Sequence, residues 1–319
     1  MKRALIIGAA GFVGNYLIDH MLDEGIWSVS VTKMAFEKIE KQGVDIYDLD
    51  IMDCNAISAL LEKVHPEYIF HLAAQSSVAV SWKKPDLTVD VNIKGSIHVL
   101  DAIRKLDYKP RVLLIGSGEE YGKVRPEDIP IKEDVLPHPG NLYAATKNCQ
   151  NSIGKIFADA FEMDIMSTRS FNHIGPNQAP IFVVSDFCKQ VAEMEKGIRE
   201  GTVKDPVIHV GNLTAKRDFT DVRDVVRAYC MLMENGKAGE TYNVGTGHAV
   251  SIQSILDSIL SLSSAEIRVE VDPSRLRPVD VPIIEPDIGK LKKATGWNPE
   301  ISLQRTLRET LDFWRKNIN

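Results

Sequence analysis

Three glycines near the start of the chain, Gly8, Gly11 and Gly14, constrain its possible folds more than any other feature of the sequence. They form the motif Gly-Ala-Ala-Gly-Phe-Val-Gly between an apolar run at residues 4–8 and an amphipathic stretch at residues 13–24. This context predicts a strand that turns into a helix. Glycines at this spacing permit a tight turn and let a pyrophosphate approach the helix N-terminus, where free N–H groups favour negative charge. We therefore expect a dinucleotide-binding unit rather than a tight turn without a ligand.

Apolar runs and amphipathic stretches continue to alternate through the first half of the chain. Runs that are apolar at every position are typical of strands covered on both faces, as in a parallel sheet between helix layers. The predicted strands are residues 29–32, 68–73, 111–116 and 164–170, and the predicted helices are residues 55–64, 91–104 and 143–161. This alternation predicts an α/β fold with a Rossmann-like, doubly wound parallel sheet.

After Arg169 the alternation becomes less regular, although no low-complexity linker or internal repeat separates the two halves. The predicted helices here are residues 182–197, 221–234, 252–260 and 303–317, the predicted strands are residues 207–210 and 241–245, and the proline-rich stretch 273–286 is a predicted loop. We expect the second lobe to exchange segments with the first instead of following it as a separate unit.

A second motif, Tyr143-Ala-Ala-Thr-Lys147, lies in a predicted helix. Residues four apart share a helix face, so the phenol and the ammonium project together, and a nearby cation lowers the pKa of a phenol from about 10 toward a useful acid–base range. Alone, the pair also fits a solvated helix face. Ser117 follows a predicted strand at the edge where open α/β sheets bind ligands, and its hydroxyl can bond the oxygen that the phenol protonates. Alone, it also fits a loop or cap serine.

The composition excludes several classes of protein. A chain of 319 residues is long enough to form one large globular domain or two closely joined ones, and 44% hydrophobic and 26% charged residues are the ordinary composition of a globular protein. A net charge of −6 disfavours nucleic-acid binding, and no apolar run approaches the roughly 20 residues of a membrane helix. Four widely spaced cysteines form no CxxC pair, which argues against a zinc site and fits reduced thiols. We expect a cytoplasmic protein without a metal, nucleic-acid or membrane partner.

Together, the glycine motif, Ser117, Tyr143 and Lys147, in this order, resemble the extended short-chain dehydrogenase/reductase family of nucleotide-sugar enzymes across essentially the whole chain. The local matches are most similar to the GDP-mannose dehydratases and GDP-6-deoxy-D-mannose reductases. The resemblance implies a smaller mixed C-terminal lobe that binds the nucleotide sugar. The implied division is a Rossmann domain at 1–170 with return segments at about 215–248, a nucleotide-sugar-binding lobe at 171–214 and 249–302, and a closing helix at 303–319.

The resemblance also implies roles for individual residues. The implied catalytic residues are Ser117, Glu119, Tyr143 and Lys147. The implied cofactor-binding residues are Gly8, Gly11, Phe12, Val13, Gly14, Thr32, Lys33, Asp50, Ile51, Leu72, Ala73, Ala74, Tyr143 and Lys147. The implied substrate-binding residues are Asn172, Lys189, Arg217, Arg277 and Asp280. Further matches are Asn92 near the active site, His173 beside nicotinamide and substrate, and the C-terminal signature Gly296-Trp-Asn-Pro299.

Arginine chemistry agrees with part of this assignment. Arg217 and Arg277 carry forked donors suited to a diphosphate, although a surface ion pair is the commoner use of an arginine. Asn172 and His173 equally fit a role in stabilising a loop.

One departure from the family pattern concerns dehydration. The dehydratases carry a Thr, an acidic or hydroxyl residue and a Glu where this chain has Ser117, Gly118 and Glu119. Gly118 cannot act as an acid. We expect dehydration to be lost, although Glu119 is retained.

A second departure concerns the cofactor. NAD-binding enzymes place Asp or Glu at the end of the second strand to bind the ribose hydroxyls. This chain has Thr32 and Lys33 there, with no carboxylate before Glu37. A cation favours a 2′-phosphate, so we expect a preference for NADP(H), with NAD(H) possible.

The resemblance and these departures lead to one main hypothesis about function. An NAD(P)H-dependent 4-ketoreductase would convert GDP-4-keto-6-deoxy-D-mannose into GDP-D-rhamnose, with Tyr143 as proton donor, Ser117 polarising the carbonyl and Lys147 holding the nicotinamide ribose. The alternatives are a GDP-mannose 4,6-dehydratase or 4-epimerase, which recycle their cofactor, and a non-catalytic NADP(H)-binding regulator. Similarity to related enzymes also implies a homodimer, through a four-helix bundle of residues 91–104 and 143–161.

Overall fold

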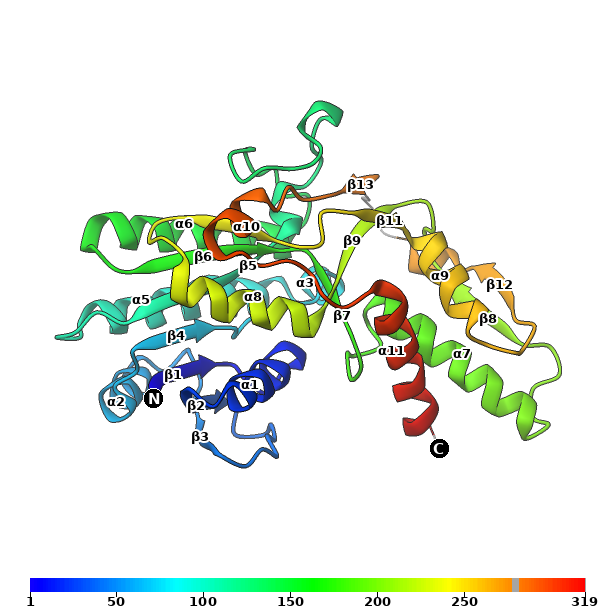
Figure 1. The fold of residues 1–319 in the computed structure, drawn as a ribbon, viewed down its shortest axis with the longest axis horizontal. Helices are drawn as coiled ribbons and strands as arrows, with labels where there is room; N and C mark the ends of the chain where they lie inside the picture. The colour runs from blue at the N-terminus through cyan, green and yellow to red at the C-terminus, as the bar shows by residue number, and fades with distance from the viewer. Residues whose placement is uncertain (277–280, 319) are drawn as a thin grey trace.

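In the computed structural model, which describes residues 1–276 and 281–318, seven parallel strands form the central sheet in the order β10-β6-β5-β4-β1-β2-β3 (Figure 1). The strands are β1 (Lys2–Ile7), β2 (Trp27–Lys33), β3 (Val44–Asp48), β4 (Tyr68–His71), β5 (Arg111–Ser117), β6 (Ile165–Ser170) and β10 (Thr241–Val244). The order runs outward in opposite directions from β1 and β4. A ligand crevice is expected at this reversal, beyond the C-terminal ends of the strands.

Helices cover both faces of this sheet, as the apolar strands require. On one face lie α1 (Phe12–Glu24), α8 (Val222–Asn235) and α10 (Gly289–Thr295), and on the other lie α2 (Cys54–Val64), α5 (Ser96–Arg104) and α6 (Leu142–Phe161). Leu17 and Tyr229 are buried in the first layer, and Leu61 and Leu100 in the second. Each such side chain stabilises the fold by about 1.5–3 kcal/mol. The predicted doubly wound α/β fold is confirmed.

The second lobe lies at one end of the long axis of the molecule, at the right in Figure 1. It contains a small sheet of β7 (Asn172–Ile174), β9 (Lys216–Asp221), β11 (Ala249–Ser251) and β13 (Ile283–Ile284), and a parallel pair of β8 (Val207–Val210) and β12 (Arg268–Val271). Its helices are α7 (Val183–Arg199), α9 (Ile252–Ser261) and α11 (Leu303–Asn317). Phe187, Ile255 and Leu311 belong to its separate hydrophobic core.

Several short elements differ from the sequence expectations. The predicted helix at 91–104 begins as a π-helical turn over Asp90–Gly95, and α5 starts only at Ser96. Part of the predicted loop at 273–286 forms β13. The sequence analysis also missed α3 (Val78–Lys83), α4 (Pro85–Val89), α10 and five strands, β3, β7, β9, β11 and β12.

Hydrogen bonds from the C-terminal signature, Gly296-Trp-Asn-Pro299, and the residues just after it connect the end of α10 to α8. Gly296 ends α10 with a φ of +73°, a left-handed conformation that favours glycine. Trp297 is fully buried, and its Nε1 donates to the Asp224 carbonyl oxygen at 3.0 Å. The Asp224 carboxylate accepts hydrogen bonds from the backbone N–H groups of Glu300 and Ile301. No helix in the described part of the chain is long and apolar enough to span a membrane.

Candidate active site

The turn after β1 shows why its glycines are needed. Gly8 has a φ of +82°, and a Cβ atom there would lie 2.5 Å from the backbone of Ala73. A Cβ atom on Gly14 would lie 2.3 Å from the carbonyl oxygen of Ala9. At Gly11, which precedes α1, a Cβ atom would meet nothing within 4 Å. The turn therefore leaves space beside the first N–H groups of α1, where a phosphate can approach.

Thr32 is part of this turn, whereas Lys33 has a different partner. The N–H of Gly8 donates to Thr32 Oγ1 at 3.0 Å, and the N–H of Ala9 donates to the Thr32 carbonyl oxygen at 2.8 Å. Lys33 Nζ lies 2.5 Å from Asp48 Oδ1 on the neighbouring strand β3. The cation expected to attract a 2′-phosphate is thus already paired with a carboxylate that the sequence analysis did not consider.

The remaining predicted cofactor residues follow strand ends at the same edge of the sheet. Asp50 accepts a hydrogen bond from the Met52 N–H at 2.9 Å, and Ile51 is buried. A Cβ atom on Gly95 would lie 2.4 Å from Ile51 Cδ1, so this position must stay small. Phe12 and Val13 form the first turn of α1, and Leu72, Ala73 and Ala74 directly follow β4.

Asn92 connects the loop after β4 to α6. Its Oδ1 accepts a hydrogen bond from the Gln75 N–H at 2.8 Å, and its Nδ2 donates to the Gln75 carbonyl oxygen and to Thr146 Oγ1. Asn92 is fully buried in the π-helical turn, a distortion that is common at functional sites. It therefore fixes the loop after β4 relative to α6, the helix that carries Tyr143.

The predicted catalytic side chains come together from β5 and α6. Ser117 ends β5, and its hydroxyl lies close enough to the phenol of Tyr143, in the first turn of α6, to lower the pKa of that phenol. Lys147 is almost fully buried, and its Nζ donates to the Ile115 carbonyl oxygen at 2.7 Å and to Gln150 Oε1 at 3.0 Å. Three side chains separated in sequence thus meet where β5 ends.

Burial controls the acid–base properties of these groups. It raises the pKa of Tyr143, and the hydrogen bond from Ser117 opposes this only in part. Burial lowers the pKa of Lys147 to about 8, although nearby Glu120 favours its charged form. The expectation of a lowered phenol pKa is wrong for this structure, because burial of Tyr143 disfavours the phenolate and outweighs the opposing effect of Ser117. At neutral pH the phenol is a proton donor, not a base.

A buried ion pair beneath Ser117 was missed by the sequence analysis. Glu120 is fully buried, and its Oε2 accepts a hydrogen bond from Arg169 Nε at 3.1 Å. Its Oε1 accepts from the Ser117 N–H at 2.8 Å and from Asn151 Nδ2 at 2.9 Å. Burial raises the pKa of Glu120 despite these contacts, and Arg169 also lies 4.5 Å from the ring centroid of Tyr121. This network fixes the backbone at the end of β5.

The two residues between Ser117 and this ion pair differ in what they can contribute. Glu119 Oε2 accepts a hydrogen bond from Asn141 Nδ2 at 3.2 Å, near the N-terminus of α6. A Cβ atom on Gly118 would lie 2.9 Å from the ring of Phe171. The Phe171 ring thus takes up the space in which an acidic or hydroxyl side chain at position 118 would begin.

His173 connects the second lobe to the glycine turn. Its ring stacks on Phe12 with centroids 6.3 Å apart, and burial lowers its pKa, which favours a neutral imidazole. Asn172 lies two residues after β6, at the start of β7. Arg277 and Asp280, two of the predicted substrate-binding residues, lie outside the described residues.

The other two predicted substrate-binding residues have protein partners. Lys189 Nζ, on α7, lies 3.6 Å from Glu193 Oε1 and 5.7 Å from the ring centroid of Trp314. Arg217, on β9, is buried, and its Nη1 donates to the Val281 carbonyl oxygen at 2.6 Å. Arg217 thus joins β9 to the segment that leads into β13.

Comparison with known proteins places this geometry among nucleotide-sugar enzymes. A family model described as GDP-mannose 4,6 dehydratase matches residues 5–310. The GDP-6-deoxy-D-mannose reductase of Pseudomonas aeruginosa is 29% identical over 317 residues, which cover 99% of this chain and 98% of that protein. The GDP-mannose 4,6-dehydratase of Yersinia enterocolitica is 26% identical over 354 residues, covering 97% of this chain and 92% of that protein.

Solved structures are similar to this chain over the same length. RMD from Pseudomonas aeruginosa, complexed with NADPH, has a TM-score of 0.86 at 28% identity and covers 99% of both chains. UDP-glucose 4-epimerase from Thermus thermophilus, complexed with NAD, has a TM-score of 0.86 at 27% identity and also covers 99% of both chains. The similarity therefore includes both lobes.

Proposed function

Because the chain belongs to the GDP-mannose 4,6-dehydratase family of extended short-chain dehydrogenases/reductases, we propose that it reduces GDP-4-keto-6-deoxy-D-mannose to GDP-D-rhamnose with NAD(P)H. The relatives are NAD(P)-dependent reductases, dehydratases or epimerases of nucleotide sugars. The observation that carries the proposal is the Phe171 ring against Gly118, beside a phenol that burial keeps protonated. These features suit proton donation to a ketone better than elimination of water.

The glycine turn fits a dinucleotide. Side chains at Gly8 and Gly14 would collide with backbone, whereas Gly11 faces open space next to the first turn of α1. These positions would hold the pyrophosphate through backbone N–H groups. When bound, the nicotinamide cofactor supplies the hydride that the C4 carbon receives.

The side chains near the end of β5 would donate the proton and orient the substrate carbonyl in the proposed reduction. Tyr143 gives its phenolic proton to the C4 oxygen, and its raised pKa ensures that this proton is present at neutral pH. The hydroxyl of Ser117 hydrogen-bonds the same oxygen and orients the carbonyl. Lys147, with a pKa near 8, remains mostly ammonium at neutral pH. It can bind the ribose hydroxyls and offset the phenolate that remains after proton transfer.

Dehydration needs more than these groups provide. Once C4 is oxidised, a base must take the C5 proton and an acid must protonate the departing C6 hydroxyl. Glu119 has the position to be the base, and this retained carboxylate is the observation that keeps 4,6-dehydratase activity as the second candidate. Gly118 offers no acid, so Glu119 would have to perform both roles.

A paired assay tests the proposed reaction. We expect GDP-4-keto-6-deoxy-D-mannose to be consumed with an equimolar amount of NADPH oxidised. We expect GDP-mannose with NADP⁺ to give no 4-keto product. Absorbance of NADPH and chromatography of the sugar nucleotides measure the two reactions. Efficient dehydration of GDP-mannose without net change in the cofactor would overturn the proposal in favour of the dehydratase.

We also propose that NADP(H) is preferred over NAD(H), because Lys33 ends β2 where a 2′-phosphate would lie. Lys33→Asp is expected to lower the NADPH/NADH ratio of kcat/KM by about 10–100-fold, the value of a charge-assisted hydrogen bond of 1.5–3 kcal/mol. Asp48→Asn is the matched control, since it frees the Lys33 ammonium and should maintain or increase the preference. An unchanged ratio in Lys33→Asp would show that another group selects the cofactor.

We further propose a homodimer in which α5 and α6 form a four-helix bundle with the same helices of a second copy. Ile156 and Phe161 on α6 are 60% and 43% exposed, which leaves apolar surface on that helix. Sedimentation should give a mass of about twice 35.5 kDa, and Ile156→Asp should shift the protein to the monomer. A wild-type chain that sediments as a monomer at micromolar concentration would contradict the dimer.

A further inference from the structure

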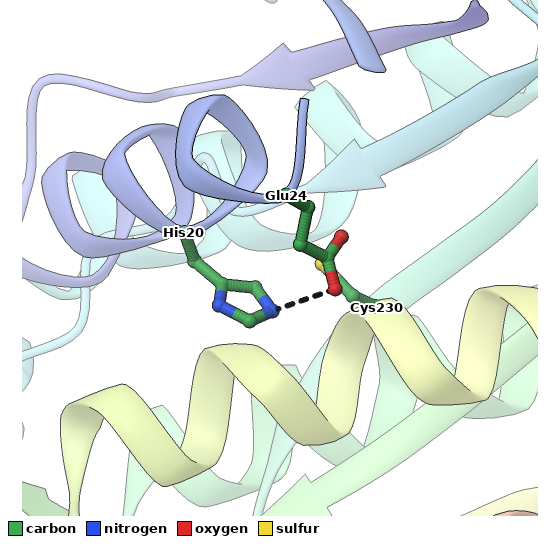
Figure 2. A group of neighbouring side chains, drawn as sticks. All are labelled: His20, Glu24 and Cys230. Atoms are coloured by element: carbon green, nitrogen blue, oxygen red, sulfur yellow. Dashed lines mark ion pairs between the residues drawn. The ribbon is translucent and has the colours of Figure 1, made fainter. Parts of the chain in front are cut away.

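Outside the candidate active site, three side chains with metal-binding chemistry converge between α1 and α8 (Figure 2). His20 and Glu24 are four residues apart on α1 and therefore share a face of the helix. Cys230 faces them from α8. One ligand atom from each residue lies within 4.8 Å of the other two, and His20 Nε2 lies 3.4 Å from Glu24 Oε1.

The donor atoms of this cluster are not fully used within the protein. His20 Nε2 is buried and has no hydrogen-bond partner among the described residues, although it is within ion-pair distance of Glu24. Cys230 is only 2% exposed, and burial raises the pKa of its thiol. The other carboxylate oxygen of Glu24 accepts a hydrogen bond from Trp27 Nε1 at 2.6 Å. Such an outer contact orients a carboxylate ligand.

The electrostatic environment of His20, Glu24 and Cys230 favours a bound cation. Glu24 is the last residue of α1, where the helix dipole is negative, and the last turn contains no basic residue. Two cations act on this cluster, Arg227 on His20 and Lys2 on Cys230. The Arg227 guanidinium is paired with Asp224 and Glu300, and the Lys2 ammonium is paired with Glu234, so the repulsion that they would exert on a bound cation is reduced.

The donor set indicates which cation would bind. Imidazole nitrogen, carboxylate oxygen and thiolate sulfur together select zinc-like divalent ions over Mg²⁺ or Ca²⁺. Ligand atoms around a tetrahedral zinc lie roughly 3.3–3.6 Å apart, given bonds of 2.0–2.3 Å. The His20–Glu24 distance of 3.4 Å already matches, and side-chain rotation can bring Cys230 closer.

We propose that His20, Glu24 and Cys230 bind one Zn²⁺ ion, with water as the fourth ligand, and that this ion fastens α1 to α8. Binding forms a sulfur–zinc bond and releases the thiol proton to solvent. The sequence analysis expected no metal because it looked for closely spaced cysteines. Here the ligands come from helices more than 200 residues apart, since Glu24 and Cys230 differ by 206 positions.

The test uses the full-length protein freed of metal by a chelator and titrated with Co²⁺, which reports thiolate coordination by light absorption. We expect a near-ultraviolet sulfur-to-cobalt charge-transfer band that saturates at one equivalent and disappears when Zn²⁺ is added. Cys230→Ser should abolish the band. Cys188→Ser, which changes another buried cysteine on α7, should keep it.

A second variant keeps the test decisive if Cys230→Ser does not fold. His20→Gln changes a partly exposed side chain and should weaken Zn²⁺ binding, followed by calorimetry, by more than about 100-fold, the upper loss seen when only an outer contact of a metal ligand is removed. No charge-transfer band in the wild-type chain, a band that persists in Cys230→Ser, or unchanged affinity in His20→Gln would overturn the proposal. These readouts do not depend on the proposed reductase activity.

Discussion

Tyr143→Phe is expected to lower the turnover of GDP-4-keto-6-deoxy-D-mannose by about 10²–10⁴-fold and to leave NADPH binding nearly unchanged. The phenylalanine keeps the ring and its packing, and it removes the only proton at the end of the Ser117 hydrogen bond. Since the Tyr143 phenol carries its proton at neutral pH, its loss acts on the proton-transfer step. Steady-state kcat and an NADPH fluorescence titration measure the two effects.

A second tyrosine provides the control for this experiment. Tyr242 is buried near the start of β10, and its hydroxyl accepts a hydrogen bond from the Lys237 N–H at 2.9 Å. Tyr242→Phe should cost stability of about 1 kcal/mol and leave kcat unchanged. If Tyr143→Phe retained wild-type turnover, another group would have to protonate the C4 oxygen.

Glu120→Ala is expected to reduce the free energy of unfolding by about 3–5 kcal/mol, because it leaves the Arg169 guanidinium buried without its partner. The variant also removes the acceptor for the Ser117 N–H and for Asn151. The midpoint and slope of urea denaturation measure the change.

The adjacent glutamate is the matched control. Glu119→Ala removes a partly exposed carboxylate whose hydrogen bond is to Asn141, so it should cost less than about 1 kcal/mol. Replacing Glu120 and Arg169 together with apolar residues of similar volume should restore most of the lost stability. A loss below 1 kcal/mol in Glu120→Ala would show that Arg169 finds other partners or water.

The sequence predicted those elements whose burial follows a local pattern. The predicted strand at 207–210 and the predicted helix at 303–317 match the structure to the residue, and α1, α2 and α6 begin within one residue of prediction. Strand β3 was missed because it lies at the sheet edge and three of its five residues are exposed.

Strand β9 was missed for the opposite reason. Its sequence, Lys-Arg-Asp-Phe-Thr-Asp, looks like a loop, yet all but its first residue are buried. Asp218 accepts hydrogen bonds from the backbone N–H groups of Thr246, Gly247 and His248, about 30 positions away. Partners at such separation are not visible in a local pattern.

The residues of the candidate site also fall into those that local sequence patterns predicted and those that they did not. The glycine turn, Ser117, Tyr143 and Lys147 were found from local spacing, and the structure brings Ser117 together with Tyr143. The direction of the Tyr143 pKa shift was predicted wrongly, because it depends on burial in the folded protein, which local spacing does not reveal. Glu120 was missed because its partner Arg169 is 49 positions away.

The path of the chain between its two sheets limits how such an enzyme can diversify. The chain leaves the central sheet after β6, builds β7 and β9, returns to form β10, and leaves again through β11. No single continuous stretch of gene therefore encodes the second lobe without also encoding a strand of the first. An exchange of the whole second lobe in one continuous piece would therefore also replace β10 of the central sheet, and with it the contacts that β10 makes with β6.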